Sequence, residues 1–533
     1  MQVTGSARER MKSMKHTDRL IACAATITLA SCGGGSGSSG QQYAIGGTVR
    51  GLSGSGLVLQ STVAGTLTVS SDGPFQFPTA VAIGTSYTVS VRTQPANPSQ
   101  TCAASGATAS GTVSGANVAN VEITCSAVAN AARFVYVTNR GSNDISGYRI
   151  DNATGALTAM NGSPFPAGVS PTWLTLHPSG NFAYVSNGGA NTITAYAIEA
   201  TSGGLTPIGG APVLVRPFSS VEYPISPVVI DPSGNLAFIG NSNAPIVGDS
   251  QPDNLDVYHI DTGSGALAPV AGSPFSTNSP FPDFVAVDPA GKFVYAFDYI
   301  THVGVGGLSI ASFAIDPTAG TVTAVSGSPF GPFQPYPQCY GLAPNGKFIY
   351  EGTIGGTVQA FIINETTGAL TAGQTASFES DYCLVDPSSR FIYATNGSAI
   401  AGYVVDQTTG TLTTIGGTPV TVADSHALAS MTIHPTGRLL YAISAEAIYA
   451  FAIDSVSGSL TTVPGSPFTV ARSTDKLNPS VTIEPAGRFA YVTSRTSNSI
   501  YGLSVDASNG ALTPITGSPF TAGTSPGPIA FLR

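Results

Sequence analysis

Two histidines and an arginine are the side chains in this sequence best suited to hydrolytic chemistry. With a neighbouring carboxylate, His302 or His426 could act as the general base that opens an ester or a lactone. Arg216 could stabilise the oxyanion that develops during such a reaction. For each of these residues the alternative is a solvated loop side chain with no part in catalysis.

Carboxylates and tyrosines in the same segments could form a binding surface. Aromatic rings supply rigid contact area, which suits a sugar or a protein partner. The candidate ligand-binding residues are Glu222, Tyr223, Asp298, Tyr299 and Tyr336. The sequence has no Gly-x-Ser-x-Gly motif in a strand–turn–helix setting and no Cys/His spacing typical of a metal site. We therefore expect no metal and no other cofactor.

A repeat that begins near Arg133 must position these residues. The first copy opens with a strand that reads Phe-Val-Tyr-Val-Thr, and equivalent strands begin at Phe134, Phe182, Leu236, Phe293, Phe348, Phe391, Leu439 and Phe489. The mean spacing is about 51 residues, as expected for four-stranded propeller blades. We predict an all-β chain in which residues 127–533 form a β-propeller of about eight four-stranded blades, with seven as the alternative.

The phase of the repeat predicts how the ring closes. The first copy starts at the second strand of a blade, and residues 528–533 resemble the missing first strand. The C-terminal strand should therefore complete the first blade and remove an exposed sheet edge. The turns after strands one and three are tight and repeated, whereas the loops after strands two and four vary. The candidate site residues should therefore share the face that carries the variable loops.

Acidic and histidine side chains recur at the head of one turn, in the pattern Asp-Pro-Ser-Gly. These residues are His177, Asp231, Asp288, Asp386, His434 and Glu484. An Asp followed by Pro and closed by Gly is the signature of a type I turn. We interpret the six residues as turn-forming residues and not as metal ligands.

The repeated motifs resemble those of the lactonase-type seven-bladed propeller family over roughly residues 133–533. They are Tyr-Val-Thr-Asn at 136–139, Tyr-Arg-Ile-Asp, Thr-Gly-Ala-Leu-Thr, and His-Pro-Ser-Gly before the next aromatic strand. The resemblance implies the propeller fold, and the family includes 6-phosphogluconolactonases and muconate-lactonising enzymes. This chain departs from the family in its count of eight copies. Segments 280–283 and 336–339 also lack the His that enzyme members tend to carry, so we transfer no catalytic residue.

The N-terminus resembles an export signal. Residues 1–31 combine a basic leader with a short apolar segment, and the Leu-Ala-Ser-Cys sequence that ends at Cys32 resembles a bacterial lipobox. The resemblance implies cleavage before Cys32 and lipid attachment to its sulfur, followed by a Gly/Ser tether over residues 32–42. We expect the membrane to be a partner through this anchor. The expected location is the cell envelope, at the periplasmic side or the surface of the outer membrane.

Residues 43–126, between the tether and the repeat, contain short strand-like runs separated by turn residues. This pattern predicts a small Ig-like β-sandwich. We expect Cys102 and Cys125 to form a disulfide there, as suits an oxidising compartment. Cys339 and Cys383 lie near the starts of successive equivalent strands, and both a disulfide and two free buried thiols are open for them.

Charge and domain order narrow the function classes. The net charge is −9 and the body of the chain has no basic cluster, so we expect no nucleic-acid partner. The favoured hypothesis is an exported, lipid-anchored module that binds an unknown protein, glycan or small molecule. The alternative is a lactonase-like hydrolase or isomerase that acts on a small lactone or related metabolite. A purely structural role in the envelope is the third hypothesis.

Overall fold

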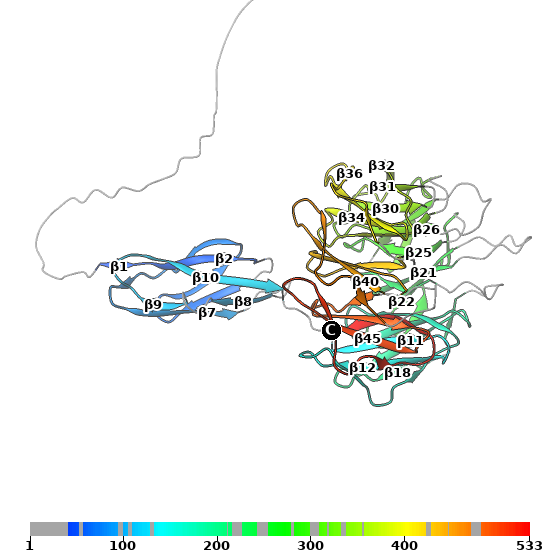
Figure 1. Cartoon of the computed structure of the whole chain (residues 1–533), viewed down its shortest axis with the longest axis horizontal. Coiled ribbons are helices and arrows are strands. Elements are labelled where there is room, and N and C mark those ends of the chain that lie inside the picture. Colours follow the sequence, from blue (N-terminus) through cyan, green and yellow to red (C-terminus); the bar gives the residue numbers. More distant parts are fainter. Residues whose placement is uncertain are drawn as a thin grey trace, which may run out of the picture. The chain divides into compact units, whose positions relative to one another are not determined.

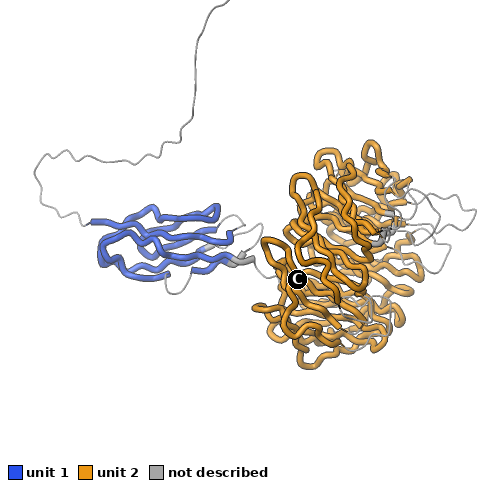
Figure 2. The backbone as a smooth tube through the Cα atoms, turned by 45° about the horizontal axis from the view of Figure 1, so that its top comes forward, with its two compact units in different colours: residues 1–128 blue, residues 129–533 orange. Residues whose placement is uncertain are grey.

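The computed structural model describes residues 41–52, 57–93, 100–104, 109–127, 133–209, 212–215, 226–241, 254–278, 282–298, 309–316, 319–331, 337–353, 356–422, 428–445, 447–470 and 481–533. The chain divides into two compact units, residues 1–128 and 129–533 (Figure 2). Both are built from β-strands (Figure 1). Among the described residues, no helix has the length and hydropathy needed to cross a membrane.

The first unit is a small β-sandwich. One sheet has the strand order β5-β2-β10-β8, the other has the order β4-β3-β7-β9, and β1 pairs with β6. Alternate residues of β3 are buried, because one face of the strand packs on the core. The strands are β1 (Gln42–Tyr43), β2 (Ile45–Arg50), β3 (Leu57–Ser61), β4 (Gly65–Val69), β5 (Gly73–Gln76), β6 (Val81–Ala82), β7 (Ser86–Thr93), β8 (Gln100–Ala104), β9 (Ser110–Thr112) and β10 (Val118–Ala127). Cys102 and Cys125 lie opposite each other on β8 and β10 and form the expected disulfide.

The second unit contains eight antiparallel sheets in the described part of the chain, which confirms the predicted propeller and its blade count. We number the blades in the order of their second strands. The first strands are β48 (Pro526–Leu532), β15 (Pro171–Leu176), β20 (Val229–Ile230), β25 (Pro282–Val287), β29 (Pro337–Leu342), β33 (Tyr382–Val385), β38 (Ser430–Ile433) and β43 (Val481–Ile483). The second strands are β11 (Phe134–Asn139), β16 (Phe182–Asn187), β21 (Leu236–Asn241), β26 (Phe293–Asp298), β30 (Phe348–Thr353), β34 (Phe391–Thr395), β39 (Leu439–Ile443) and β44 (Phe489–Ser494).

The outer half of each blade follows in the same order. The third strands are β12 (Asp144–Ile150), β17 (Thr192–Ile198), β22 (Asn254–Ile260), β27 (Ile310–Asp316), β31 (Thr357–Ile363), β35 (Ala399–Val405), β40 (Ala447–Ile453) and β45 (Ser499–Val505). The fourth strands are β13 (Leu157–Ala159), β18 (Leu205–Pro207), β23 (Leu267–Pro269), β28 (Thr321–Ala324), β32 (Leu370–Ser377), β36 (Leu412–Thr414), β41 (Leu460–Thr462) and β46 (Leu512–Pro514). Six blades add a short strand beside the third: β14 (Phe165–Pro166), β19 (Val213–Leu214), β24 (Phe275–Ser276), β37 (Val420–Thr421), β42 (Phe468–Thr469) and β47 (Phe520–Thr521).

The chain closes the ring as predicted. β48 pairs antiparallel with β11, so the last strand of the sequence is the first strand of blade one. Tyr491 of blade eight donates a hydrogen bond from its hydroxyl to the carbonyl of Gly155 in blade one, at 2.7 Å. The described sheets therefore join end to end, and the inner edge of blade one is covered.

A buried tyrosine on the second strand links one blade to the next. Its hydroxyl donates to the carbonyl of the glycine in the turn between strands three and four of the following blade. The pairs are Tyr136 to Gly203, Tyr184 to Gly265, Tyr393 to Gly458, Tyr441 to Gly510 and Tyr491 to Gly155. These tyrosines have no exposed surface, so each hydrogen bond satisfies a polar group that water cannot reach.

Two other repeat motifs hold the backbone. The Ser or Thr of the Gly-Ser-Pro-Phe segment accepts a backbone N–H from the third strand of its own blade, as in Gly147 to Ser163 and Ala450 to Ser466. The carboxylate of Asp231 accepts backbone N–H groups of its own turn, and His177 is hydrogen-bonded at both ring nitrogens, one of them to the carbonyl of Gly234. These contacts are those of turn-forming residues.

A second disulfide settles the question that the sequence left open. Cys339 on β29 and Cys383 on β33 form a disulfide, so the first strands of blades five and six are covalently joined. Both cysteines are buried in one apolar cluster that the two blades share.

Candidate ligand-binding channel

Most of the residues that the sequence suggested for chemistry lie outside the described part of the chain. They are Arg216, Glu222, Tyr223, Tyr299, His302, Tyr336 and His426. Asp298 is described as the last residue of β26, where its backbone lies opposite Pro282. The site is therefore built here from the strands around the propeller axis.

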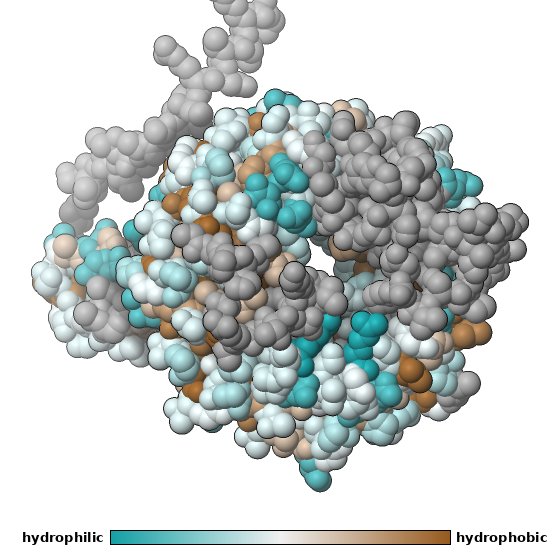
Figure 3. All heavy atoms as spheres, turned by 45° about the vertical axis from the view of Figure 1, so that its right-hand side comes forward, coloured by the Kyte–Doolittle hydropathy of each residue, from teal (hydrophilic) through white to brown (hydrophobic). Residues whose placement is uncertain are grey.

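The first strands of the blades surround a central channel. Each is the inner edge of its sheet, and neighbouring first strands contact each other, as β15 contacts β48 and β33 contacts both β29 and β38. The space-filling view shows an opening in the middle of the propeller (Figure 3). Side chains on these strands that keep exposed surface meet solvent in this channel or at its mouth.

Exposed aromatic side chains gather on the channel wall. Trp173, Phe284 and Tyr382 are 38%, 38% and 37% exposed, and they are the aromatic members of the exposed large hydrophobic residues in the described chain. They lie opposite Ser186, Phe297 and Thr395, which are the fifth residues of their second strands. The three rings therefore occupy one level of the channel, on blades two, four and six.

Blades five and seven have small residues at the same level. Cys339 of blade five lies opposite Gly352, and Ser430 of blade seven lies opposite Ile443. Eight blades in a ring are about 45° apart, so aromatics on alternate blades are about 90° apart.

Phe284 is held by an aromatic cluster at the interface of blades four and five. Its ring is stacked against Tyr340 of β29, with ring centres 6.0 Å apart, and it contacts Phe297 at 5.4 Å. Phe297 and Tyr340 are 4.5 Å apart. We call Trp173, Phe284, Tyr340 and Tyr382 the channel aromatics. The cluster fixes the position of Phe284 before any ligand arrives, which lowers the entropy lost on binding.

Two carboxylates lie in the segment that leads to Tyr382. Glu379 and Asp381 are exposed, whereas Ser380 between them has no exposed surface. The segment is fixed because the backbone N–H of Ser380 donates to the carbonyl of Thr353, and that of Asp381 donates to the carbonyl of Thr395. Cys383, two residues after Asp381, is fixed by its disulfide with Cys339.

Electrostatics distinguish this segment from an ordinary surface loop. Burial first, and then the charge of Glu379, raise the pKa of the Asp381 carboxyl above its ordinary value. Burial also raises the pKa of the Tyr382 phenol, although more than a third of its side chain is exposed. Both shifts fit groups in a channel that is open to water but enclosed by protein.

A buried carboxylate lies directly behind the channel wall. Glu351 is 1% exposed and is paired in the sheet register with Tyr340. The equivalent residues of the other second strands are all apolar: Val137, Val185, Ile239, Ala296, Ala394, Ala442 and Val492. Carboxylates are rarely buried without a purpose, because desolvation is costly. This departure from the repeat singles out the wall between blades four and five.

Sequence reasoning missed these residues because it looked for polar side chains on loops. The signal was present, since Trp173 is the single tryptophan of the chain and lies four residues before the repeated turn motif that begins at His177. Glu351 interrupts an otherwise apolar position of the repeat. In the described part of the chain, no three His, Cys, Asp or Glu residues are grouped closely enough to hold a metal ion.

Comparison with known proteins finds similarity to propellers. The family described as "Lactonase, 7-bladed beta-propeller" matches residues 88–220. A 6-phosphogluconolactonase-like structure from Bacteroides fragilis has 17% identity and a TM-score of 0.49, and the match covers 76% of this chain and 100% of that one. The periplasmic gluconolactonase PpgL of Pseudomonas aeruginosa has 18% identity and a TM-score of 0.48, with 75% and 99% covered. No curated protein matches the chain significantly.

Proposed function

We propose that this chain, whose second unit is a β-propeller and which is similar in part to the lactonase type, is an exported, lipid-anchored protein that binds a small polyhydroxylated ligand, such as a sugar, in its central channel. Aromatic faces stack on the C–H groups of such ligands, and carboxylates accept hydrogen bonds from hydroxyl groups. The channel aromatics and the Glu379–Asp381 segment offer both around the same channel.

The observation that carries this proposal is that three exposed aromatic rings, on blades two, four and six, lie at one level of the channel. Exposed aromatic side chains lose apolar hydration when a ligand covers them, and they lose little conformational entropy. An inert channel would gain nothing from leaving Trp173, Phe284 and Tyr382 more than a third exposed.

Export and lipid anchoring rest on the leader and on Cys32, which lie outside the described residues. Two disulfides in the described units are consistent with an oxidising compartment. Replacing Cys32 by Ser should move the protein from the membrane fraction to the soluble fraction of the envelope. Equal membrane retention of the variant would contradict the lipid anchor.

Intrinsic fluorescence provides a direct binding assay, because Trp173 is the only tryptophan. Purified protein should be titrated with a panel of monosaccharides, disaccharides and aldonolactones. We expect one class to change the emission saturably, and Tyr382→Ala to weaken its binding about tenfold, as for a buried aromatic contact. Val456, 76% exposed in a turn outside the channel, provides the matched control Val456→Ala, which should bind normally.

Lactone hydrolysis is the second candidate, and one observation favours it. A carboxyl group with a raised pKa beside a channel can act as a general base or acid, and Asp381 has this property. If ligands of the panel are turned over, Asp381→Asn should abolish turnover and leave binding within a few fold. Saturable binding with no turnover would leave the protein as a binding module, and binding that is unchanged in Tyr382→Ala would refute the channel site.

A further inference from the structure

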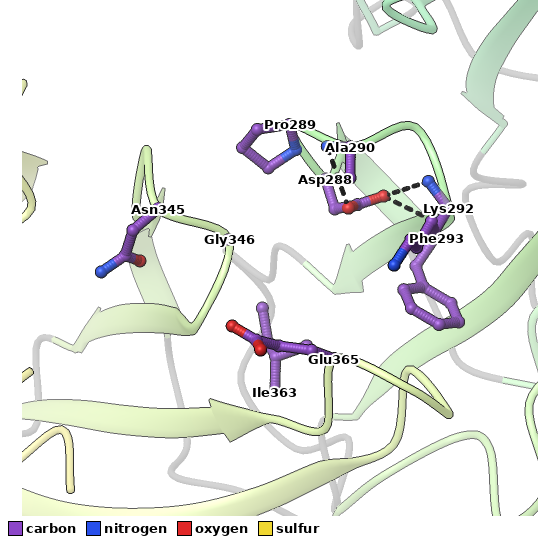
Figure 4. Close-up of a pocket in the computed structure, with 9 residues that line it drawn as sticks. All are labelled: Asp288, Pro289, Ala290, Lys292, Phe293, Asn345, Gly346, Ile363 and Glu365. Atoms are coloured by element: carbon purple, nitrogen blue, oxygen red, sulfur yellow. Dashed lines mark hydrogen bonds between the residues drawn. The ribbon is translucent and has the colours of Figure 1, made fainter. Parts of the chain in front are cut away.

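We propose that the interface between blades four and five holds a binding site for a guanidinium group, on the face opposite the variable loops. A pocket of about 340 Å³ lies there. Its walls come from the turn after β25, the equivalent turn after β29 and the turn after β31. The polar residues at the pocket are Asp288, Lys292, Asn345 and Glu365, and the ring of Phe293 forms part of its wall (Figure 4).

Arginine fills the equivalent place between three other pairs of blades. Arg390, which precedes the second strand of blade six, lies over the ring of Phe391 at 5.1 Å. Its guanidinium donates to the carbonyls of Ser455 and Val456, the second and third residues of the next blade's turn between strands three and four. This combination of a ring face and two carbonyls is a guanidinium site by geometry.

Blades one and eight repeat the arrangement. Arg488 lies over Phe489 and donates to the carbonyl of Asn152. Arg133 lies over Phe134 and donates to the carbonyl of Ala200. The same chemical environment is therefore built three times in this chain, each time with an arginine of the chain itself as occupant.

Blade four has the environment without the arginine. Phe293 supplies the ring, and the turn that begins at Asn364 supplies the equivalent second and third residues, Glu365 and Thr366. That turn has the common form, since the Asn364 side chain accepts the N–H groups of Thr366 and Thr367 as Asp151 accepts those of Ala153 and Thr154. The residue before Phe293 is Lys292, whose ammonium group cannot present two parallel donors.

Blade one shows that such a site accepts two cations. Arg149, paired with Phe134 in the sheet register, also lies over that ring at 5.1 Å and donates to the carbonyl of Thr201 at 2.7 Å. In blade four the residue paired with Phe293 is Ala314. The small side chain leaves the second cation position open beside Lys292. A guest guanidinium there would also meet the Glu365 carboxylate, which lines the pocket and whose charge is shared with the exposed Lys347 at 3.9 Å.

The guest could be the arginine side chain of a protein partner or a free guanidino compound. The probe is the peptide acetyl-Gly-Gly-Arg-Gly-Gly-amide, titrated into the full-length protein by saturation-transfer NMR. We expect saturable binding that is at least tenfold weaker for the same peptide with citrulline, which has the shape of arginine without its charge. A parallel titration with free L-arginine distinguishes the sources. Equal affinity indicates a small guanidino compound, and weaker affinity indicates a side chain within a polypeptide.

Two variants should fill the proposed site with an arginine side chain of the protein itself. Ala314→Arg copies Arg149, and Lys292→Arg copies Arg390, so each should reduce peptide affinity at least tenfold. Ala452→Arg is the matched control, because Ala452 has the equivalent position in blade seven, opposite Leu439. It should leave binding unchanged. Trp173 fluorescence checks that each variant is folded. Equal binding of the citrulline peptide, or unchanged affinity in both closing variants, would overturn the proposal.

Discussion

The tyrosines that connect adjacent blades should contribute to the free energy of unfolding, and other tyrosines of the same repeat position provide internal controls. Tyr184, Tyr393 and Tyr491 donate to buried or enclosed glycine carbonyls of the next blade. Replacing each by Phe removes the hydroxyl and leaves the carbonyl without its donor. Because an unsatisfied buried acceptor costs about 1 to 3 kcal/mol, each variant should lose that much free energy of unfolding.

Two tyrosines of the same repeat position should behave differently. The hydroxyls of Tyr295 and Tyr350 are buried without a hydrogen-bond partner in the described structure. For Tyr295 the reason is visible, since Ser312 donates to the carbonyl of Gly368 at 2.9 Å and takes the acceptor that Tyr295 would use. Tyr295→Phe and Tyr350→Phe should therefore be neutral or slightly stabilising, because they remove a polar atom that gains nothing in the folded state.

The effects are large enough to measure when they are combined. The unfolding entropy of a protein is about 2.1 cal/mol/K per residue. For a unit as large as the propeller, a loss of about 1 kcal/mol in the free energy of unfolding therefore lowers the melting temperature by about 1 °C. The triple variant Tyr184→Phe, Tyr393→Phe, Tyr491→Phe joins distant sites, so the losses should add to a fall of about 4 to 10 °C. The double control Tyr295→Phe, Tyr350→Phe should unfold at the wild-type temperature or above.

The assay is thermal and urea unfolding followed by tryptophan fluorescence, which reports on the propeller alone because Trp173 is the only tryptophan. A second signal, circular dichroism, checks that the transition is shared by the whole unit. If the control variant loses as much stability as the triple variant, the loss comes from packing and not from hydrogen bonds. The reasoning about the tyrosine hydrogen bonds between blades would then be wrong.

Two further predictions concern pH and the second disulfide. Burial raises the pKa of nine tyrosines in the propeller, to about 12 for Tyr196 and further for the others. The folded state therefore resists ionisation of these phenols, whereas the unfolded chain ionises near pH 10. Their contribution to the free energy of unfolding is complete below pH 10 and is lost as the pH rises above it. Each of these tyrosines therefore destabilises the folded state as the pH rises above 10, and tyrosinate absorbance should rise in one cooperative step together with unfolding. Independent, gradual titration of the tyrosines would contradict this. The Cys339–Cys383 disulfide closes a loop of 44 residues, and replacing both cysteines by Ala should lower propeller stability by roughly 4 kcal/mol in urea unfolding. Replacing Cys102 and Cys125, which belong to the other unit, should leave the Trp173 transition unmoved.

The sequence was sufficient for the parts of the fold that repeat. Blade number, strand order and closure by residues 528–533 follow from a motif that recurs often enough to average out local exceptions. The turn residues could also be interpreted correctly, because Asp-Pro-Ser-Gly carries its own hydrogen-bond acceptor and its own φ constraint. The pairing of Cys339 with Cys383 could not, because it depends on whether the two side chains face each other across the interface of blades five and six.

The channel was harder to predict for a physical reason. A side chain on the first strand of a blade can be buried between blades or exposed to the channel, and the alternation of the strand does not say which. Trp173 and Leu174 are successive residues of β15, yet one is exposed and the other packs on an apolar cluster of blades one and two. Only the curvature of the closed ring decides between them.

Departures from the repeat are therefore the most informative positions in a propeller of this kind. The consensus residues are explained by packing, turns and hydrogen bonds between blades, so their chemistry is already used. At Glu351 a carboxylate replaces an apolar residue, and Lys292 occupies a position where blades one, six, seven and eight have arginine. Both residues belong to blades four and five, and so do Phe284 and Tyr340 of the channel wall. Packing alone does not require a carboxylate at Glu351, because the other seven blades have an apolar residue at this position. These exceptions in neighbouring blades support the proposed binding at the channel and at the guanidinium pocket on the opposite face.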